Sequence, residues 1–229
     1  MQTLRSLREV SKMNMKKAID SNYHQSIKTP PSAAGGLLVI INYGAGNIQS
    51  IKFALKRLGY DAVLSSDVEE IQHADKVIFP GVGEASSAMS KLRNSGLDTI
   101  IPTLKQPVLG ICLGMQLMCN SSEEGDTKGL GIFDVPVIKF DTKTVKVPQI
   151  GWNQINHLES DLFTGIPEDE HIYLVHSFYV PVCEQTIAET HYGSTYSAAL
   201  QKDNFYGTQF HPEKSGDLGA QILNNFLQL

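Results

Sequence analysis

The sequence has few cysteines, one tryptophan and no long apolar run. Its three cysteines are an odd number and show no metal-like C-x-x-C spacing, so the composition favours a reducing cytoplasm over an oxidising compartment. No segment approaches the roughly 20 apolar residues that a membrane-spanning helix requires. The net charge is −5 and no basic stripe with interleaved aromatic residues is present, which argues against nucleic acid as a partner.

The first 36 residues differ from the rest of the chain. They are mostly polar, carry no sustained apolar period and end in "TPPSAAGG", which is typical of a linker. A secretory signal is excluded because no apolar core is present, and Glu9 and Asp20 interrupt the basic bias of a transit peptide. We predict a disordered leader over residues 1–36 and one folded domain over residues 37–229. An organellar address for the leader is the alternative.

Apolar runs of strand length alternate with segments of helical period from Leu37 onward. The expected strands are 37–42, 61–66, 76–80 and 107–111, and the expected helices are 48–59, 85–96 and 113–122. This order predicts an α/β fold with a mostly parallel sheet and helices on both faces. After Gly131 strand patterns dominate, at 135–140, 172–180, 186–192, 197–202 and 205–210, and a helix over 215–229 ends the chain. Extra antiparallel strands are therefore expected in the C-terminal half.

The segment "GICLG" at 110–114 lies between an expected strand and an expected helix. It matches the nucleophile elbow, in which glycines flank a sharp turn that carries the nucleophile, with cysteine in place of serine. Cys112 would lie at a helix N-terminus, where partial positive charge favours the thiolate, and the amide of Leu113 would point toward a developing oxyanion. The alternative is an ordinary strand–helix turn with a buried cysteine.

The segment "FHPEKS" supplies a partner for such a nucleophile about a hundred residues later. Pro212 favours an extended backbone at His211, and residues two apart in an extended chain face the same side. Glu213 is therefore expected to hold the imidazole of His211, which gives a Cys–His–Glu arrangement of nucleophile, general base and orienting carboxylate. By itself "HPE" is also compatible with a surface turn.

A second glycine turn, "PGVG" at 80–83, follows the strand expected at 76–80 and so lies at the same sheet edge as Cys112. Its glycines permit a backbone whose successive amides converge on an anion. Amides of Gly81, Val82 and Gly83 are therefore candidates for an oxyanion hole. A plain proline–glycine turn is the alternative. "GAGNIQ" at 44–49 lacks the third glycine of a dinucleotide fingerprint and is interpreted as a turn into a helix, with Asn47 near the cap.

Taken together, "PGVG", "GICLGMQ" and "FHPEKS" resemble the motifs of class I glutamine amidotransferases. With "VIINYGAGNIQSI", "KVPQIGWN" and "LVHSFYV", the closer resemblance is to glutaminase subunits of imidazole glycerol phosphate synthase, over about residues 37–229. The resemblance implies a flavodoxin-like fold and hydrolysis of L-glutamine to glutamate and ammonia. It also implies a heterodimer with a (β/α)₈-barrel cyclase, which uses the ammonia to form imidazole glycerol phosphate and an aminoimidazole carboxamide ribonucleotide. No metal or organic cofactor is implied.

Further residues have expected roles, and the role of Gln116 is implied by the resemblance. Gln116 matches a residue that binds the substrate glutamine, whereas a solvent-facing helical glutamine is the plain alternative. Asn47, Trp152 and Lys214 are expected at the partner interface, although a lone tryptophan is more often in the core. His176 is expected to be structural.

Three rival functions follow from the same residues. They are an amidotransferase subunit for another synthase, such as one forming anthranilate or pyridoxal phosphate, a cysteine hydrolase acting on peptides or esters, and a catalytically silent binding subunit. "KVPQIGWN" argues against the first, and the intact Cys112, His211 and Glu213 argue against the last.

Overall fold

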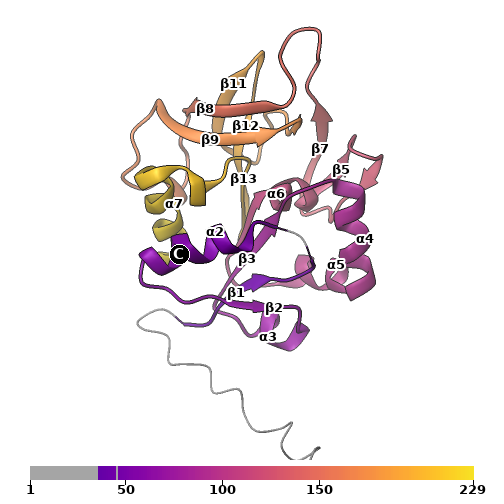
Figure 1. Cartoon of the computed structure of the whole chain (residues 1–229), viewed down its shortest axis with the longest axis vertical. Helices are drawn as coiled ribbons and strands as arrows, with labels where there is room; N and C mark the ends of the chain where they lie inside the picture. Colours follow the sequence, from indigo (N-terminus) through magenta and orange to yellow (C-terminus); the bar gives the residue numbers. More distant parts are fainter. Residues whose placement is uncertain (1–35, 45) are drawn as a thin grey trace, which may run out of the picture. The chain divides into compact units, whose positions relative to one another are not determined.

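The computed structural model describes residues 36–229 with the exception of Ala45, so the predicted leader lies outside the described residues except for Gly36. A seven-stranded sheet with the order β11-β12-β13-β4-β3-β1-β2 forms its centre (Figure 1). These strands are β1 (Leu38–Ile41), β2 (Val63–Ser65), β3 (Lys76–Gly81), β4 (Val108–Cys112), β11 (Thr186–Tyr192), β12 (Ser194–Lys202) and β13 (Phe205–Thr208). The pairings from β2 to β13 are parallel, whereas β12 and β11 are antiparallel additions. The predicted mixed α/β sheet is confirmed.

Helices cover both faces of this sheet (Figure 1). Alternate residues of a strand point to opposite faces, and in β1 Leu38 and Ile40 pack in one core cluster while Val39 and Ile41 pack in the other. The first cluster contains the apolar sides of α2 (Ile48–Arg57) and α7 (Gly216–Gln228), and the second contains those of α4 (Ala85–Ser95) and α6 (Leu113–Met118). The remaining helical segments are α3 (Val68–Gln72), α5 (Leu97–Ile100), η1 (Ile101–Thr103), η2 (Asp161–Phe163) and η3 (Pro212–Lys214).

Two smaller sheets lie beyond the carboxyl ends of β1, β3 and β4. One has the order β10-β7-β5-β6, and the other is the antiparallel pair of β8 and β9. Their strands are β5 (Cys119–Ser122), β6 (Thr127–Lys128), β7 (Phe133–Lys139), β8 (Gln149–Ile155), β9 (Glu170–His176) and β10 (Phe178–Tyr179). The single strand expected over 172–180 is thus divided at Ser177 between two sheets.

The helix predicted over 113–122 is wrong in its second half. α6 ends at Met118, and residues 119–122 form β5, which pairs with β6 and β7. All six residues of α6 are buried, whereas "NSS" at 120–122 has short polar side chains that compete with helical hydrogen bonds. Pairing with residues farther along the chain therefore decides the structure of 119–122.

The strand over 76–80 was predicted one residue too short. β3 continues through Pro80 to Gly81, which pairs with Cys112 of β4. Proline is tolerated there because β1 pairs with β3 only as far as Ile78, so no neighbour requires the missing N–H on that side.

The expected strands omit one that begins within "KVPQIGWN". Its residues from Gln149 onward form β8, which pairs along its whole length with β9. Gln149 and Ile155 are buried at the ends of the strand, whereas Ile150 and Trp152 are 63% and 57% exposed. Glycine and asparagine have low strand propensity, so the sequence pattern does not indicate a strand here. The strand forms because it pairs with β9.

Candidate active site

Cys112 lies at the abrupt junction of β4 and α6. It is the last residue of the strand and the N-cap of the helix, and its backbone has φ 53° and ψ −110°. A non-glycine residue with positive φ is strained unless its surroundings hold it. The strand–turn–helix context expected for a nucleophile elbow is therefore present, and it presents the thiol at the carboxyl edge of the sheet.

Close packing explains the two glycines that flank this turn. A Cβ at Gly114 would lie 2.0 Å from the carbonyl oxygen of Phe79, and a Cβ at Gly110 would lie 2.4 Å from Cε of Met118. Gly81 serves the same packing from the neighbouring strand, because a Cβ there would lie 2.4 Å from the amide nitrogen of Gly114. The elbow can form only because all three positions lack a side chain.

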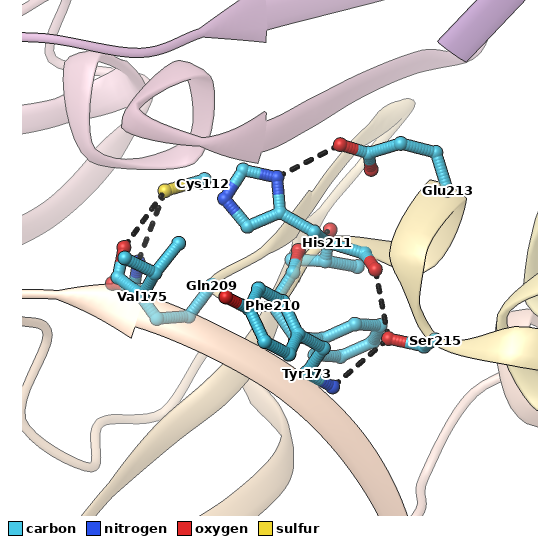
Figure 2. A network of polar contacts seen from close by, with 9 residues as sticks. Cys112, Tyr173, Val175, Gln209, Phe210, His211, Glu213 and Ser215 are labelled. Atoms are coloured by element: carbon cyan, nitrogen blue, oxygen red, sulfur yellow. Dashed lines mark hydrogen bonds and ion pairs between the residues drawn. The ribbon is translucent and has the colours of Figure 1, made fainter. Parts of the chain in front are cut away.

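His211 and Glu213 form the contact that the sequence predicts. Nδ1 of His211 lies 2.9 Å from Oε1 of Glu213, and both side chains are buried. The surface-turn alternative for "HPE" is therefore wrong. Figure 2 shows the imidazole between the Glu213 carboxylate and the Cys112 sulfur, so its other nitrogen, Nε2, faces the thiol.

The electrostatics of His211 favour a protonated imidazole. Burial lowers the pKa of His211, but its interactions with Cys112 and with Glu213 outweigh burial and raise the pKa above its usual value. Nε2 of His211 has no hydrogen-bond partner within the described residues, which leaves it free to exchange a proton with the sulfur or with a bound molecule. The group can act as a general acid and base.

A cavity of about 280 Å³ opens at the thiol. Its walls include Cys112 and Leu113 of the elbow, Val82 and Gly83 of the other glycine turn, and His211. It is smaller than pockets for drug-sized ligands, which begin near roughly 300 Å³, and suits a molecule of amino-acid size. Of the predicted oxyanion residues, Gly81 does not line this cavity: it is buried at the end of β3, packed against the backbone of Leu113 and Gly114.

Gln116 also borders this cavity. It is only 5% exposed, so the solvent-facing alternative is wrong. Its Nε2 donates to the carbonyl of Phe178 and to Oε1 of Gln209, each at 2.9 Å. Both N–H groups are therefore used, and the acceptor Oε1 of Gln116 remains for a ligand.

The sequence reasoning missed three residues around the thiol. Gln209 is fully buried, and its Nε2 lies 3.8 Å from the sulfur of Cys112. Glu124 lines the cavity, and burial together with the charge of Glu84 raises its pKa, although the amide of Ala85 opposes this. The hydroxyl of Tyr43 donates to the carbonyl of Pro80 at 2.8 Å, at the base of the glycine turn. Tyr43 lies within "VIINYGAGNIQSI" and Gln209 directly before "FHPEKS", but no spacing in the sequence indicates that either lies near the thiol.

The comparisons with known proteins agree with this geometry. The family model described as "Glutamine amidotransferase class-I" matches residues 39–229. The chain belongs to the class-I glutamine amidotransferases. Among relatives of this amidotransferase, "Imidazole glycerol phosphate synthase subunit HisH" of Bacteroides fragilis (strain YCH46) is 59% identical over 194 residues, which cover 84% of this chain and 99% of the relative. The protein of the same name from Yersinia pseudotuberculosis is 47% identical with the same coverage.

Solved structures share the fold of this amidotransferase at low sequence identity. One described as a glutamine amidotransferase has a TM-score of 0.65 at 18% identity, covering 83% of this chain and 97% of that chain. PurLQS from Thermotoga maritima has a TM-score of 0.64 at 16% identity, covering 85% and 98%. The class-I amidotransferase fold expected from the sequence is confirmed.

Of the residues expected at a partner interface, Trp152 lies on β8 and Lys214 in η3 of the amidotransferase. Trp152 is exposed and its ring contacts that of Tyr173 edge to face at 6.0 Å, so the core alternative is wrong. Nζ of Lys214 lies 5.8 Å from the centre of the same Tyr173 ring. Asn47 is the N-cap residue of α2, and its side chain makes no capping hydrogen bond.

His176 and the two remaining cysteines have packing roles. His176 is buried, its Nδ1 donates to the carbonyl of Phe178 at 2.7 Å and its Nε2 lies 3.1 Å from the hydroxyl of Tyr196. Cys119 is buried at the start of β5, and Cys183 is partly buried and free. Among the described residues, no group of acidic, histidine or cysteine side chains could hold a metal ion. Within the same part of the chain, no helix has the length and apolar character to cross a membrane.

Proposed function

We propose that this amidotransferase is the glutaminase component of an imidazole glycerol phosphate synthase and hydrolyses L-glutamine to glutamate and ammonia. The observation that carries this proposal is the thiol of Cys112, held in a strained turn at a small cavity and faced by an imidazole whose far side is bonded to Glu213. A nucleophile, a base and an orienting carboxylate in this order are the parts of covalent acyl transfer.

The reaction begins with attack of the Cys112 thiolate on the side-chain amide carbon of glutamine. Amide N–H groups of Leu113 and of the turn at Val82 and Gly83 stabilise the oxyanion that forms. His211 then gives its proton to the leaving nitrogen, which departs as ammonia and leaves a thioester. The same imidazole next takes a proton from water, whose oxygen attacks the thioester and releases glutamate and the thiolate.

Selectivity for glutamine comes from the polar groups that line the rest of the cavity. Oε1 of Gln116 is the acceptor left unused by its neighbours, and Glu124 lines the same cavity from the turn after β5. A carboxylate is complementary to the α-ammonium group of an amino acid. A peptide or ester substrate would leave this carboxylate without a charged partner, which costs binding free energy.

The partner is a cyclase, and we propose a (β/α)₈ barrel that forms a heterodimer with this chain and receives the ammonia. The relatives are named as subunits of a synthase, and this chain covers 99% of their length. The proposed docking surface comprises Asn47, Trp152 and Lys214, with Ile150 exposed on β8 two residues before the tryptophan. An exposed aromatic residue with a cation beside it is typical of an interface anchor. The cytoplasmic location and the leader's disorder stay predictions.

The test combines glutamine hydrolysis with partner binding. The chain is purified with and without a histidine-pathway cyclase and its nucleotide ligand, and glutamate formation is measured. We expect strong stimulation by the loaded partner and formation of imidazole glycerol phosphate only when both chains are present. Hydrolysis of esters or peptides in preference to glutamine would contradict the proposed activity.

A variant pair tests the docking surface. Trp152→Ala should weaken partner affinity at least about tenfold, as for an interface anchor. Leu64→Ala, which alters a 37% exposed side chain on β2 at the opposite edge of the sheet from β11, should leave affinity unchanged. Equal affinities of the two variants would refute the docking surface and leave the glutaminase assignment standing.

A further inference from the structure

Gln209 is the polar side chain closest to the Cys112 sulfur that the proposed reaction does not use. It follows β13, its side chain is fully buried, and its backbone N–H donates to the carbonyl of Ala198 at 2.8 Å. Its Nε2 lies 3.8 Å from the sulfur (Figure 2), which is within reach of a hydrogen bond to sulfur. Burial of a glutamine side chain without hydrogen-bond partners costs free energy that burial of an apolar side chain would not.

A chain of two amides decides which end of Gln209 faces the sulfur. The carbonyl of Phe178 can only accept a hydrogen bond, so it fixes the nitrogen end of Gln116, at 2.9 Å. The second N–H of that nitrogen donates to Gln209, also at 2.9 Å, and so requires the oxygen of Gln209 at that place. The remaining end of Gln209, its NH₂ group, then faces Cys112. The backbone of β10 thereby determines that a donor, not a lone pair, meets the thiol.

The carbonyl group on the other side of the sulfur gives this donor a role. The carbonyl oxygen of Val175 lies 3.9 Å from the sulfur and can accept from a neutral S–H, but it repels a thiolate. An N–H group on the other side favours the ionised sulfur, because hydrogen bonding to a charged form stabilises that form. When Cys112 ionises, its proton passes to Nε2 of His211, and the Gln209 donor remains on the sulfur.

We propose that Gln209 is a positioning residue that donates a hydrogen bond to the Cys112 thiolate and, through the same amide, holds Gln116 in its substrate-facing orientation. This inference rests on the proposed glutaminase function for the meaning of Gln116, but its effect on the sulfur does not require glutamine. Gln209 thus links the ionisation of Cys112 to the orientation of Gln116 in the cavity.

The test is the pH dependence of Cys112 alkylation by iodoacetamide in the full chain, followed by mass spectrometry of the Cys112 peptide. Gln209→Met removes the donor at nearly constant volume, and Gln209→Asn shortens the side chain so that the amide no longer reaches the sulfur. We expect the alkylation midpoint to rise by about one pH unit in each variant, because each loses one hydrogen bond to the thiolate. The kcat for glutamine should fall about tenfold at neutral pH and recover as the pH is raised, since the thiolate is the nucleophile. The KM should stay raised at every pH, because Gln116 loses the acceptor that orients it.

The titratable groups around the sulfur are unchanged in these variants. His211 faces it from the segment after β13, Tyr43 lies close to it after β1, and Glu124 and His176 line the same cavity. Thr190→Val is the matched control, because it removes a buried hydroxyl that donates to the carbonyl of Gln154 on a strand that does not line the cavity. It should leave the midpoint where it is.

An unchanged midpoint in either folded Gln209 variant overturns the proposal, as does a fall in turnover that is equal at every pH. Thermal unfolding identifies the folded variants, and either one alone decides the question. If the midpoint shifts but the wild-type chain with its cyclase releases no glutamate from glutamine, the proposed function fails and the role of Gln209 at the sulfur stands.

Discussion

The two glycine turns that border the cavity differ in how tightly they are packed. At the elbow, an added Cβ on Gly110 or Gly114 would overlap atoms of Met118 or Phe79. At the other turn, Gly83 has φ 101°, no atom would lie within 4 Å of an added Cβ, and Val82 is 40% exposed. The proposed nucleophile is thus held by a closely packed backbone, whereas the turn proposed to donate amides to the oxyanion has room to change.

This difference suggests separate roles for the two turns: the elbow positions the thiol, and the open turn allows activity to be regulated. A strained turn keeps its geometry only where its surroundings leave no alternative, which suits a thiol that must meet both His211 and a substrate carbon. Backbone freedom at Gly83 allows a peptide to exchange its N–H for a carbonyl at small steric cost. Losing one oxyanion donor costs about 2.7 to 4 kcal/mol of transition-state stabilisation, so we expect the loaded partner to act on the open turn.

The largest effect should come from the packed elbow. Cys112→Ala removes the nucleophile and should lower the rate of glutamine hydrolysis at least about 10⁴-fold. The free energy of unfolding and the affinity for the partner should stay nearly unchanged, because only one sulfur atom is lost. A glutamine-analogue alkylator followed by peptide mapping should label Cys112 and spare the buried Cys119. Cys183→Ala is the control and should keep full activity. Labelling at Cys183 would contradict the assignment of the nucleophile.

The next effect concerns the histidine that faces the elbow. His211→Ala should lower kcat roughly 10²-fold or more because no other group can transfer the proton. Glu213→Gln should lower it less, since the amide still occupies the place beside Nδ1 and orients the ring. Steady-state kinetics of the two variants decide the order, and a greater loss in Glu213→Gln would reverse the roles proposed here.

The parts of the molecule also differ in how well the sequence predicts them. The parallel sheet, its helices and the His211–Glu213 contact follow from local patterns and from the rule that parallel strands end at one edge. β8 does not, because its strand form depends on pairing with β9 rather than on its own residues. Gln209 could not be found either, since its orientation is set by Gln116, 93 positions earlier in the chain.

A pair of glycine variants tests the difference in packing directly. Gly114→Ala should destabilise the fold by about 4 kcal/mol or more, because a Cβ 2.0 Å from the carbonyl oxygen of Phe79 forces the backbone apart. Gly83→Ala meets no atom and should cost only about 1 to 2 kcal/mol for its unfavourable φ, yet it should lower turnover about 10²-fold by fixing the turn. Chemical denaturation and kinetics measure both quantities. Equal stability losses would remove the contrast between the turns.

The last effect concerns the cavity wall at His176 and is visible only as the pH changes. Burial lowers the pKa of His176 to about 4, outweighing its hydrogen bond to the carbonyl of Phe178. The unfolded chain binds a proton at this histidine below about pH 6.5, whereas the folded chain does so only below about 4, so the free energy of unfolding should decrease as the pH falls through this range. The contribution is at most about 3 kcal/mol.

This contribution of His176 is isolated by comparing how the free energy of unfolding depends on pH in His176→Gln and in the wild type. His191→Gln, which changes an exposed histidine on β11, should leave the pH slope unaltered. If the free energy of unfolding has the same pH dependence in the wild type and in His176→Gln, the cavity wall tolerates a charged imidazole. The wall would then be less tightly packed than the elbow.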